Sequence, residues 1–74
     1  MRIGSRNEDV KWNDVRNYRN NELKLTDWWG VKDITMSQAK KDYRIFLRDI
    51  TDNYTTANEA WDAWVLYPVE ESWF

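Results

Sequence analysis

The sequence contains neither cysteine nor histidine, and these absences remove much of the usual chemistry of proteins. Without cysteine the chain has no disulfide framework and no thiol nucleophile, and it suits a reducing cytosol. Without histidine it lacks the commonest general base and the commonest ligand of zinc and copper. Carboxylates, lysines and hydroxyls are left, so we expect no enzyme and no metal site.

Basic charge and long apolar runs are also scarce. The formal net charge is −2, whereas a protein that binds nucleic acid needs a basic surplus to neutralise phosphates. No apolar run approaches the roughly 20 residues that cross a bilayer. The stretch Met1 to Ser5 lacks the apolar centre of a signal peptide. We therefore expect no nucleic-acid partner, no membrane partner and no export.

Aromatic residues, by contrast, are abundant. The chain has six Trp, four Tyr and two Phe among 74 residues, which suffice for a single small domain over 1–74. A domain of this size lies near the lower limit for a self-sufficient core. Large aromatic side chains fill a small core efficiently, and they are also enriched at interface hot spots. Their positions therefore decide between a structural role and a binding role.

The N-terminal third predicts one helix. A capping-box pattern begins at Ser5, and the chain then continues without glycine or proline to Leu25. The helical period is clearest in the later part, so we expect the helix at about 13–25. Residues 1–12 are expected to form a flexible arm in front of it. After the helix, at least one of two adjacent tryptophans, Trp28 and Trp29, is expected to be buried.

The segment at about 36–51 has the clearest helical pattern of the chain. A second capping box begins at Thr35. An apolar stripe about 100° wide follows at Met36, Ala39, Tyr43, Phe46, Leu47 and Ile50. The other side carries cations and one aliphatic residue that we expect to be exposed, namely Lys40, Lys41, Arg44, Arg48 and Ile45. The stripe predicts that this helix packs on the first one as an antiparallel hairpin.

The last third begins with a third capping box at Thr56 and predicts a short helix at about 57–64. Beyond it, Val65 and its neighbours are β-branched and apolar, and Pro68 favours extended backbone before it. We therefore expect an extended C-terminal tail at 65–74. The predicted fold is all-α: a two-helix hairpin covered by a short helix and this tail.

The aromatic residues of the last third allow two interpretations. In the first they cover the core of the hairpin, because two helices alone cannot bury an apolar stripe. In the second they form an exposed patch that binds another protein. Trp73 and Phe74 are expected to be the exposed members, because chain ends are seldom buried unless docked. The candidate partner-binding residues are Trp61, Trp64, Tyr67, Trp73 and Phe74.

One charged residue lies on the inner side of the first helix. Arg19 shares that side with Val15 and Thr26, where an unpaired charge would be costly. An Arg side chain can hold a carboxylate with two hydrogen bonds when two helices pack together. We therefore expect Arg19 to be partly buried and to form an ion pair across the hairpin with Asp27 or Asp49.

Two blocks of the sequence resemble the tail assembly chaperone family of tailed bacteriophages. The first runs from Val15 to Trp29, as an Arg-rich helix followed by Thr-Asp-Trp. The second runs from Tyr43 to Ile50, where Tyr-Arg leads to Leu-Arg-Asp-Ile. The sequence departs from the family at Glu22, where members carry an aliphatic residue, and at the looser segment Trp64 to Pro68.

The resemblance implies a small protein that assists phage tail or tail-fibre assembly in the cytoplasm of the host bacterium. It implies a tail or tail-fibre protein as partner, and neither a cofactor nor catalysis. Two alternatives stay open: a permanent subunit of the virion tail, baseplate or fibre, and a phage-encoded binder or inhibitor of a host protein. The oligomeric state also stays open.

Overall fold

Helices make up the regular structure of this chain. The computed structural model describes residues 3–30 and 36–73. Its elements, in chain order, are the helices α1 (Trp12–Leu25), α2 (Gln38–Asn53) and α3 (Ala57–Leu66), and two 3-10 turns, η1 (Asp27–Gly30) and η2 (Glu71–Trp73). No strand occurs within these described ranges, so the predicted all-α class is confirmed.

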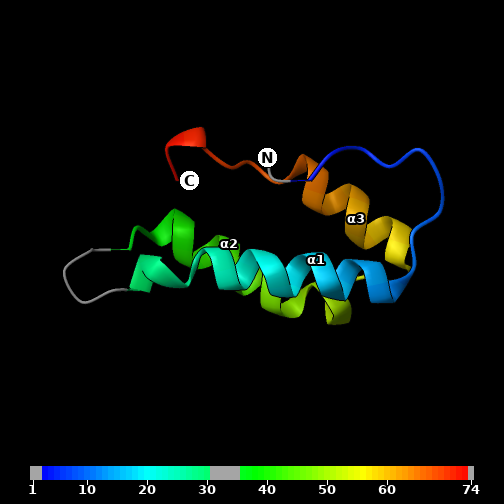
Figure 1. Ribbon diagram of the computed structural model, residues 1–74, viewed down its shortest axis with the longest axis horizontal. Coiled ribbons are helices and arrows are strands. Elements are labelled where there is room, and N and C mark those ends of the chain that lie inside the picture. Colours follow the sequence, from blue (N-terminus) through cyan, green and yellow to red (C-terminus); the bar gives the residue numbers. More distant parts are fainter. Residues whose placement is uncertain (1–2, 31–35, 74) are drawn as a thin grey trace.

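Helices α1 and α2 lie side by side as a hairpin (Figure 1). Arg19 on α1 donates a hydrogen bond to the carbonyl of Leu47 on α2 at 3.3 Å. Further along α1, Glu22 accepts a hydrogen bond from the hydroxyl of Tyr43 at 2.8 Å. Residue numbers that rise along α1 thus meet numbers that fall along α2, which shows that the two helices are antiparallel.

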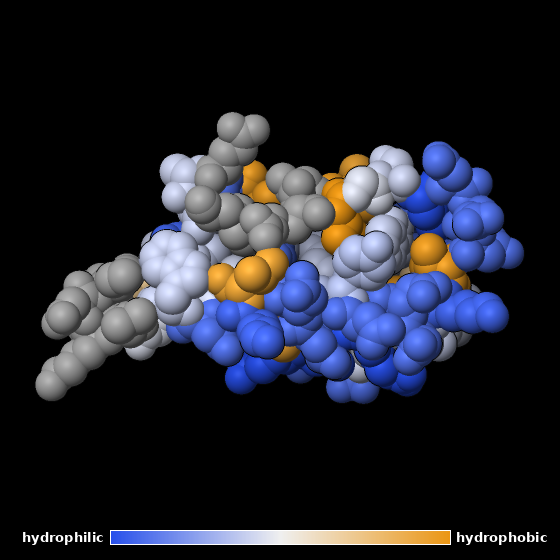
Figure 2. Space-filling view, in the orientation of Figure 1, coloured by the Kyte–Doolittle hydropathy of each residue, from blue (hydrophilic) through white to orange (hydrophobic). Residues whose placement is uncertain are grey.

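Helix α3 and the described parts of the two terminal segments, 3–11 and 67–73, form a second layer over one side of the hairpin (Figure 1). Hydrophilic residues cover much of the hairpin in this view, and hydrophobic residues reach the surface as separate patches (Figure 2). The core draws on all three helices and on both terminal segments: Ile3, Val15, Trp29, Tyr43, Leu47, Ile50, Ala57, Ala60, Trp61, Trp64 and Trp73. Burial of this aromatic area compensates for the small size of the chain.

The start of α1 depends on Asp14 and not on the predicted cap at Ser5. The backbone N–H of Lys11 donates to the Asp14 carboxylate at 3.1 Å, which satisfies one donor before the first turn. Helix α1 therefore begins at Trp12, one residue before the predicted start. No helix begins at the capping-box pattern at Ser5, and residues 3–11 are irregular.

The start of α2 depends on Ser37. Its hydroxyl accepts a hydrogen bond from the backbone N–H of Lys40 at 3.2 Å, so α2 begins two residues later than predicted. The predicted cap at Thr35 lies outside the described residues. On the predicted apolar stripe, Tyr43 and most other members are buried or half-buried, but Ala39 is exposed.

The C-terminal tail is less extended than predicted. Helix α3 includes Val65 and Leu66, and Glu71–Trp73 forms a 3-10 turn, so an extended tail over 65–74 is wrong at these positions. Pro68 disfavours helical backbone only at the residue directly before it. Tyr67 accordingly is extended, with φ −65° and ψ 129°, whereas the residues before it remain helical.

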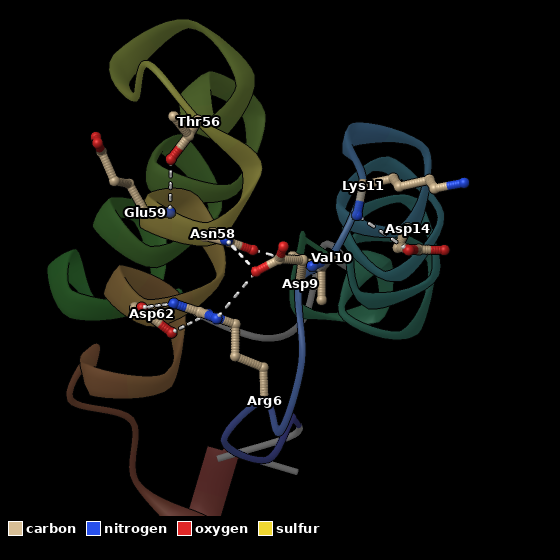
Figure 3. Close-up of polar contacts among 9 residues, drawn as sticks. All are labelled: Arg6, Asp9, Val10, Lys11, Asp14, Thr56, Asn58, Glu59 and Asp62. Atoms are coloured by element: carbon tan, nitrogen blue, oxygen red, sulfur yellow. Dashed lines mark hydrogen bonds and ion pairs between the residues drawn. The ribbon is translucent and has the colours of Figure 1, made fainter.

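The N-terminal arm is docked on α3 (Figure 3). The Arg6 guanidinium forms two hydrogen bonds with the Asp62 carboxylate, at 2.9 and 3.0 Å, and these bonds raise the pKa of Arg6 above its ordinary value. The backbone N–H of Val10 donates to the Asn58 side chain at 2.9 Å. The expectation of a flexible arm at 1–12 is therefore wrong for its described residues.

Candidate functional surface

Most of the candidate partner-binding aromatics lie inside the protein. Trp61, Trp64 and Trp73 are buried and Tyr67 is half-buried, while Phe74 lies outside the described residues. Trp73 is only 7% exposed, so the expectation that it contributes to an exposed patch is wrong. These four rings therefore cover the core of the hairpin, which is the first of the two interpretations of the C-terminal aromatic residues.

Contacts with distant parts of the chain explain the burial of Trp73. Its carbonyl accepts a hydrogen bond from the indole N–H of Trp29 at 3.0 Å. Its ring lies edge-on to Trp29, with ring centroids 5.8 Å apart, and 5.9 Å from the ring of Tyr43. Trp29 is itself fully buried, which confirms that at least one tryptophan of the Trp28-Trp29 pair is buried.

A chain of buried hydrogen bonds joins the three helices. The indole N–H of Trp64 donates to the Tyr43 hydroxyl at 2.9 Å, and this hydroxyl donates to the Glu22 carboxylate at 2.8 Å. Glu22 is only 2% exposed, so these bonds offset part of the free-energy cost of burying its polar atoms. The hydroxyl of Tyr43 thus couples α3, α2 and α1 at one point.

Replacing Tyr43 with Phe should therefore lower the free energy of unfolding by about 1–3 kcal/mol, because the hydroxyl that serves both Trp64 and Glu22 is removed. Urea unfolding followed by far-UV circular dichroism measures the change. Tyr54→Phe is a matched control, since Tyr54 is half-buried and its ring packs against Phe46. Equal losses in the two variants would contradict a structural role for the Tyr43 hydroxyl.

Arg19 is half-buried, as expected, but its partners differ from those predicted. It donates hydrogen bonds to the carbonyls of Leu47 and Arg48, at 3.3 and 3.2 Å, because the backbone of α2 faces it at this level. Asp27 pairs instead with Arg44 at 2.9 Å, and Asp49 is exposed. The predicted ion pair between Arg19 and Asp27 or Asp49 is therefore wrong.

Arg44 closes the C-terminal end of α1. Its guanidinium donates to the carbonyl of Leu23 at 3.1 Å and to the hydroxyl of Thr26, and it pairs with Asp27. The last carbonyls of a helix have no partner within the helix, and cations are favoured there. The sequence pattern placed Arg44 on a solvent-facing side of its helix and gave no direct sign of this role. The one available signal was that the last carbonyls of α1 need hydrogen-bond donors from outside the helix.

The side of α2 that points away from the core combines cations with apolar atoms. Four residues of this side and Met36, which precedes α2 and is half-buried, line one hollow of about 280 Å³, and we call this surface the α2 outer face: Met36, Lys41, Arg44, Ile45 and Arg48. Lys41 and Arg48 are exposed, and Ile45 is 44% exposed, as predicted. Positions 41, 44, 45 and 48 have the spacing of one helix side. The face is therefore a continuous surface and not a scatter of residues.

Further aromatic surface lies beside this face. Trp28 is 47% exposed, and the ammonium group of Lys40 lies 5.8 Å from its ring centroid and 5.0 Å from that of Trp29. These distances are those of cation–π contacts. Lys40 precedes Arg44 by one helical turn, so Trp28 and Lys40 extend the cationic and apolar character towards the start of α2.

Within residues 3–30 and 36–73, no group of three or more acidic side chains is placed to hold a metal ion. In the same part of the chain, no helix has the length and apolarity needed to cross a membrane. Burial raises the pKa of the Tyr67 phenol, and the charge of Asp42 raises it further.

Comparison with protein-family models, with curated proteins and with solved structures finds no match to this chain. The chemistry of its own surface is therefore the guide to its function.

Proposed function

We propose that this chain is a non-catalytic protein-binding factor that acts through the α2 outer face. The observation that carries the proposal is the exposure of Ile45 within a hollow bordered by cations. An apolar centre with a polar rim is the usual anatomy of a protein interface. The opposite side of α2 is occupied by the core, so the outer face is the part of this helix that a partner reaches.

The partner we propose is a tail or tail-fibre protein of a tailed bacteriophage, bound in the bacterial cytoplasm during assembly. The support is the resemblance of residues 15–29 and 43–50 to tail assembly chaperones. The second of these blocks supplies Arg44, Ile45 and Arg48 to the α2 outer face. The segment that carries the resemblance therefore also carries much of the surface.

The proposal predicts that a tagged form of the chain, purified from cells infected with the phage that encodes it, retains a tail or tail-fibre protein. Mass spectrometry identifies the retained protein, and an untagged culture is the control. Purified particles should contain the chain in far fewer copies than any tail subunit, because a chaperone leaves after assembly. Retention of no tail component would contradict the proposal, and copies that match the tail symmetry would assign a permanent structural role.

A further inference from the structure

The α2 outer face differs in charge from the chain as a whole. The sequence has 11 Lys and Arg against 13 Asp and Glu. Three of these cations line the hollow of this face, and Lys40 lies one turn before Arg44. Lys41 and Arg48 are exposed, whereas the guanidinium of Arg44 is held by Asp27 and by the end of α1. Lys41 and Arg48 are thus the cations of the face that are most available to a partner.

We infer that the α2 outer face binds an acidic amphipathic segment of its partner, with carboxylates on Lys41 and Arg48 and an apolar side chain in the hollow beside Ile45. This inference rests on the proposed protein-binding function and names the chemistry of the bound segment. Carboxylates complement the cations, and an apolar side chain covers the exposed aliphatic surface. From position 41 to position 48, α2 rises about 10 Å, which is the length of about two helical turns.

Two features favour a polypeptide over a nucleic acid. Met36 and Ile45 contribute apolar lining to the hollow, which suits an aliphatic or aromatic side chain and does not serve a phosphate backbone. The net charge of −2 also disfavours a long polyanion, which needs many neutralising contacts. A short acidic segment needs only the local cations.

The test is the binding of synthetic peptides to the full chain, measured by fluorescence anisotropy. The acidic peptide carries Leu and Trp at helical spacing with Glu between them, and two further peptides replace each Glu with Gln or with Lys. We expect the acidic peptide to bind most tightly and its affinity to fall as salt is added, because salt screens the charge pairs. Equal affinity for the Gln peptide would overturn the inference.

Charge reversal locates the site. In the variant Lys41→Glu/Arg48→Glu, the Kd of the acidic peptide should rise by about tenfold or more, because attraction becomes repulsion at two positions. The matched control is Arg16→Glu/Lys24→Glu, which reverses two exposed cations on α1 that do not line the hollow. The control should leave the Kd within about twofold. An equal rise in the two variants would overturn the location.

A variant of Ile45 tests the apolar contact. Ile45→Ser should weaken the binding of the acidic peptide several-fold, since the apolar contact is lost. Far-UV circular dichroism verifies the fold, and Lys41→Gln/Arg48→Gln replaces the charge reversal if that variant loses helix.

Two further results would assign the face to another occupant. Tighter binding of an oligonucleotide than of the acidic peptide would overturn the inference. Self-association of the parent that Lys41→Glu/Arg48→Glu abolishes would assign the face to a second copy and would overturn it too.

The inference and the proposed function fail in different experiments. If a tail protein is retained with unchanged affinity by Lys41→Glu/Arg48→Glu, the α2 outer face is the wrong surface, and the chain is a protein-binding factor that acts through another one. If the acidic peptide binds as expected but infected cells yield no tail partner, the phage assignment is wrong and the surface stands.

Discussion

Replacing Trp64 with Ala is expected to leave the domain close to unfolding at room temperature. Trp64 is fully buried on α3, donates its indole N–H to Tyr43 and packs against Trp61 with ring centroids 6.3 Å apart. Removing a buried Trp side chain costs about 3–5 kcal/mol. A chain of 74 residues has a total stability of about 4–11 kcal/mol, so this one change removes a large share of it.

Urea unfolding followed by far-UV circular dichroism measures this loss without relying on tryptophan fluorescence. Leu66→Ala is the matched control, because Leu66 lies on the same helix and is 82% exposed. The control should change the free energy of unfolding by less than about 0.5 kcal/mol. Two variants of equal stability would show that α3 does not cover the hairpin as described.

Replacing Trp73 with Ala is expected to lower the free energy of unfolding by about 3 kcal/mol. Its ring packs against both Trp29 and Tyr43, so its loss leaves a cavity where the C-terminal segment meets the hairpin. Trp28→Ala is the matched control, since it removes a tryptophan that is 47% exposed. In that variant the free energy of unfolding should fall by about 1 kcal/mol or less, because removing a half-exposed side chain leaves no closed cavity.

The Trp73 variant also tests the two interpretations of the C-terminal aromatics. Removing a ring that covers the core lowers stability, whereas removing a ring that contacts only a partner weakens binding and leaves the melting temperature unchanged. We expect the first pattern. Unchanged stability together with lost partner binding would restore Trp73 to the candidate binding residues.

Helix α2 shows how one short segment serves both core and surface. Tyr43 and Leu47 are fully buried, Arg44 closes the end of α1, and Ile45 and Arg48 lie on the α2 outer face. The helical period of 3.6 residues makes this division possible, because adjacent residues point about 100° apart. Charge reversal at Arg44 would therefore disturb the hairpin as well as the surface, which is why the binding test leaves it unchanged.

The positions of the three helices follow from local signals in the sequence. Capping at Thr56 and the apolar stripe with Tyr43 and Leu47 act over one or two helical turns, so a single sequence carries them in full. The same period places Ile45 on the outer side of α2. The all-α class, the hairpin and part of the candidate surface were therefore predictable. The errors at helix ends arose because neighbouring residues such as Ser37 compete for the same capping role.

The sequence by itself thus determined where the helices form and which side of α2 turns inward, since both depend on residues that are close in the chain. Only the tertiary structure decided that Arg44 and not Arg19 pairs with Asp27, and that Trp73 docks against Trp29. Trp29 and Trp73 are 44 positions apart, and no local period encodes a contact over that separation. Such contacts form because the chain must bury its remaining aromatic area, and the geometry of the folded hairpin selects which rings meet.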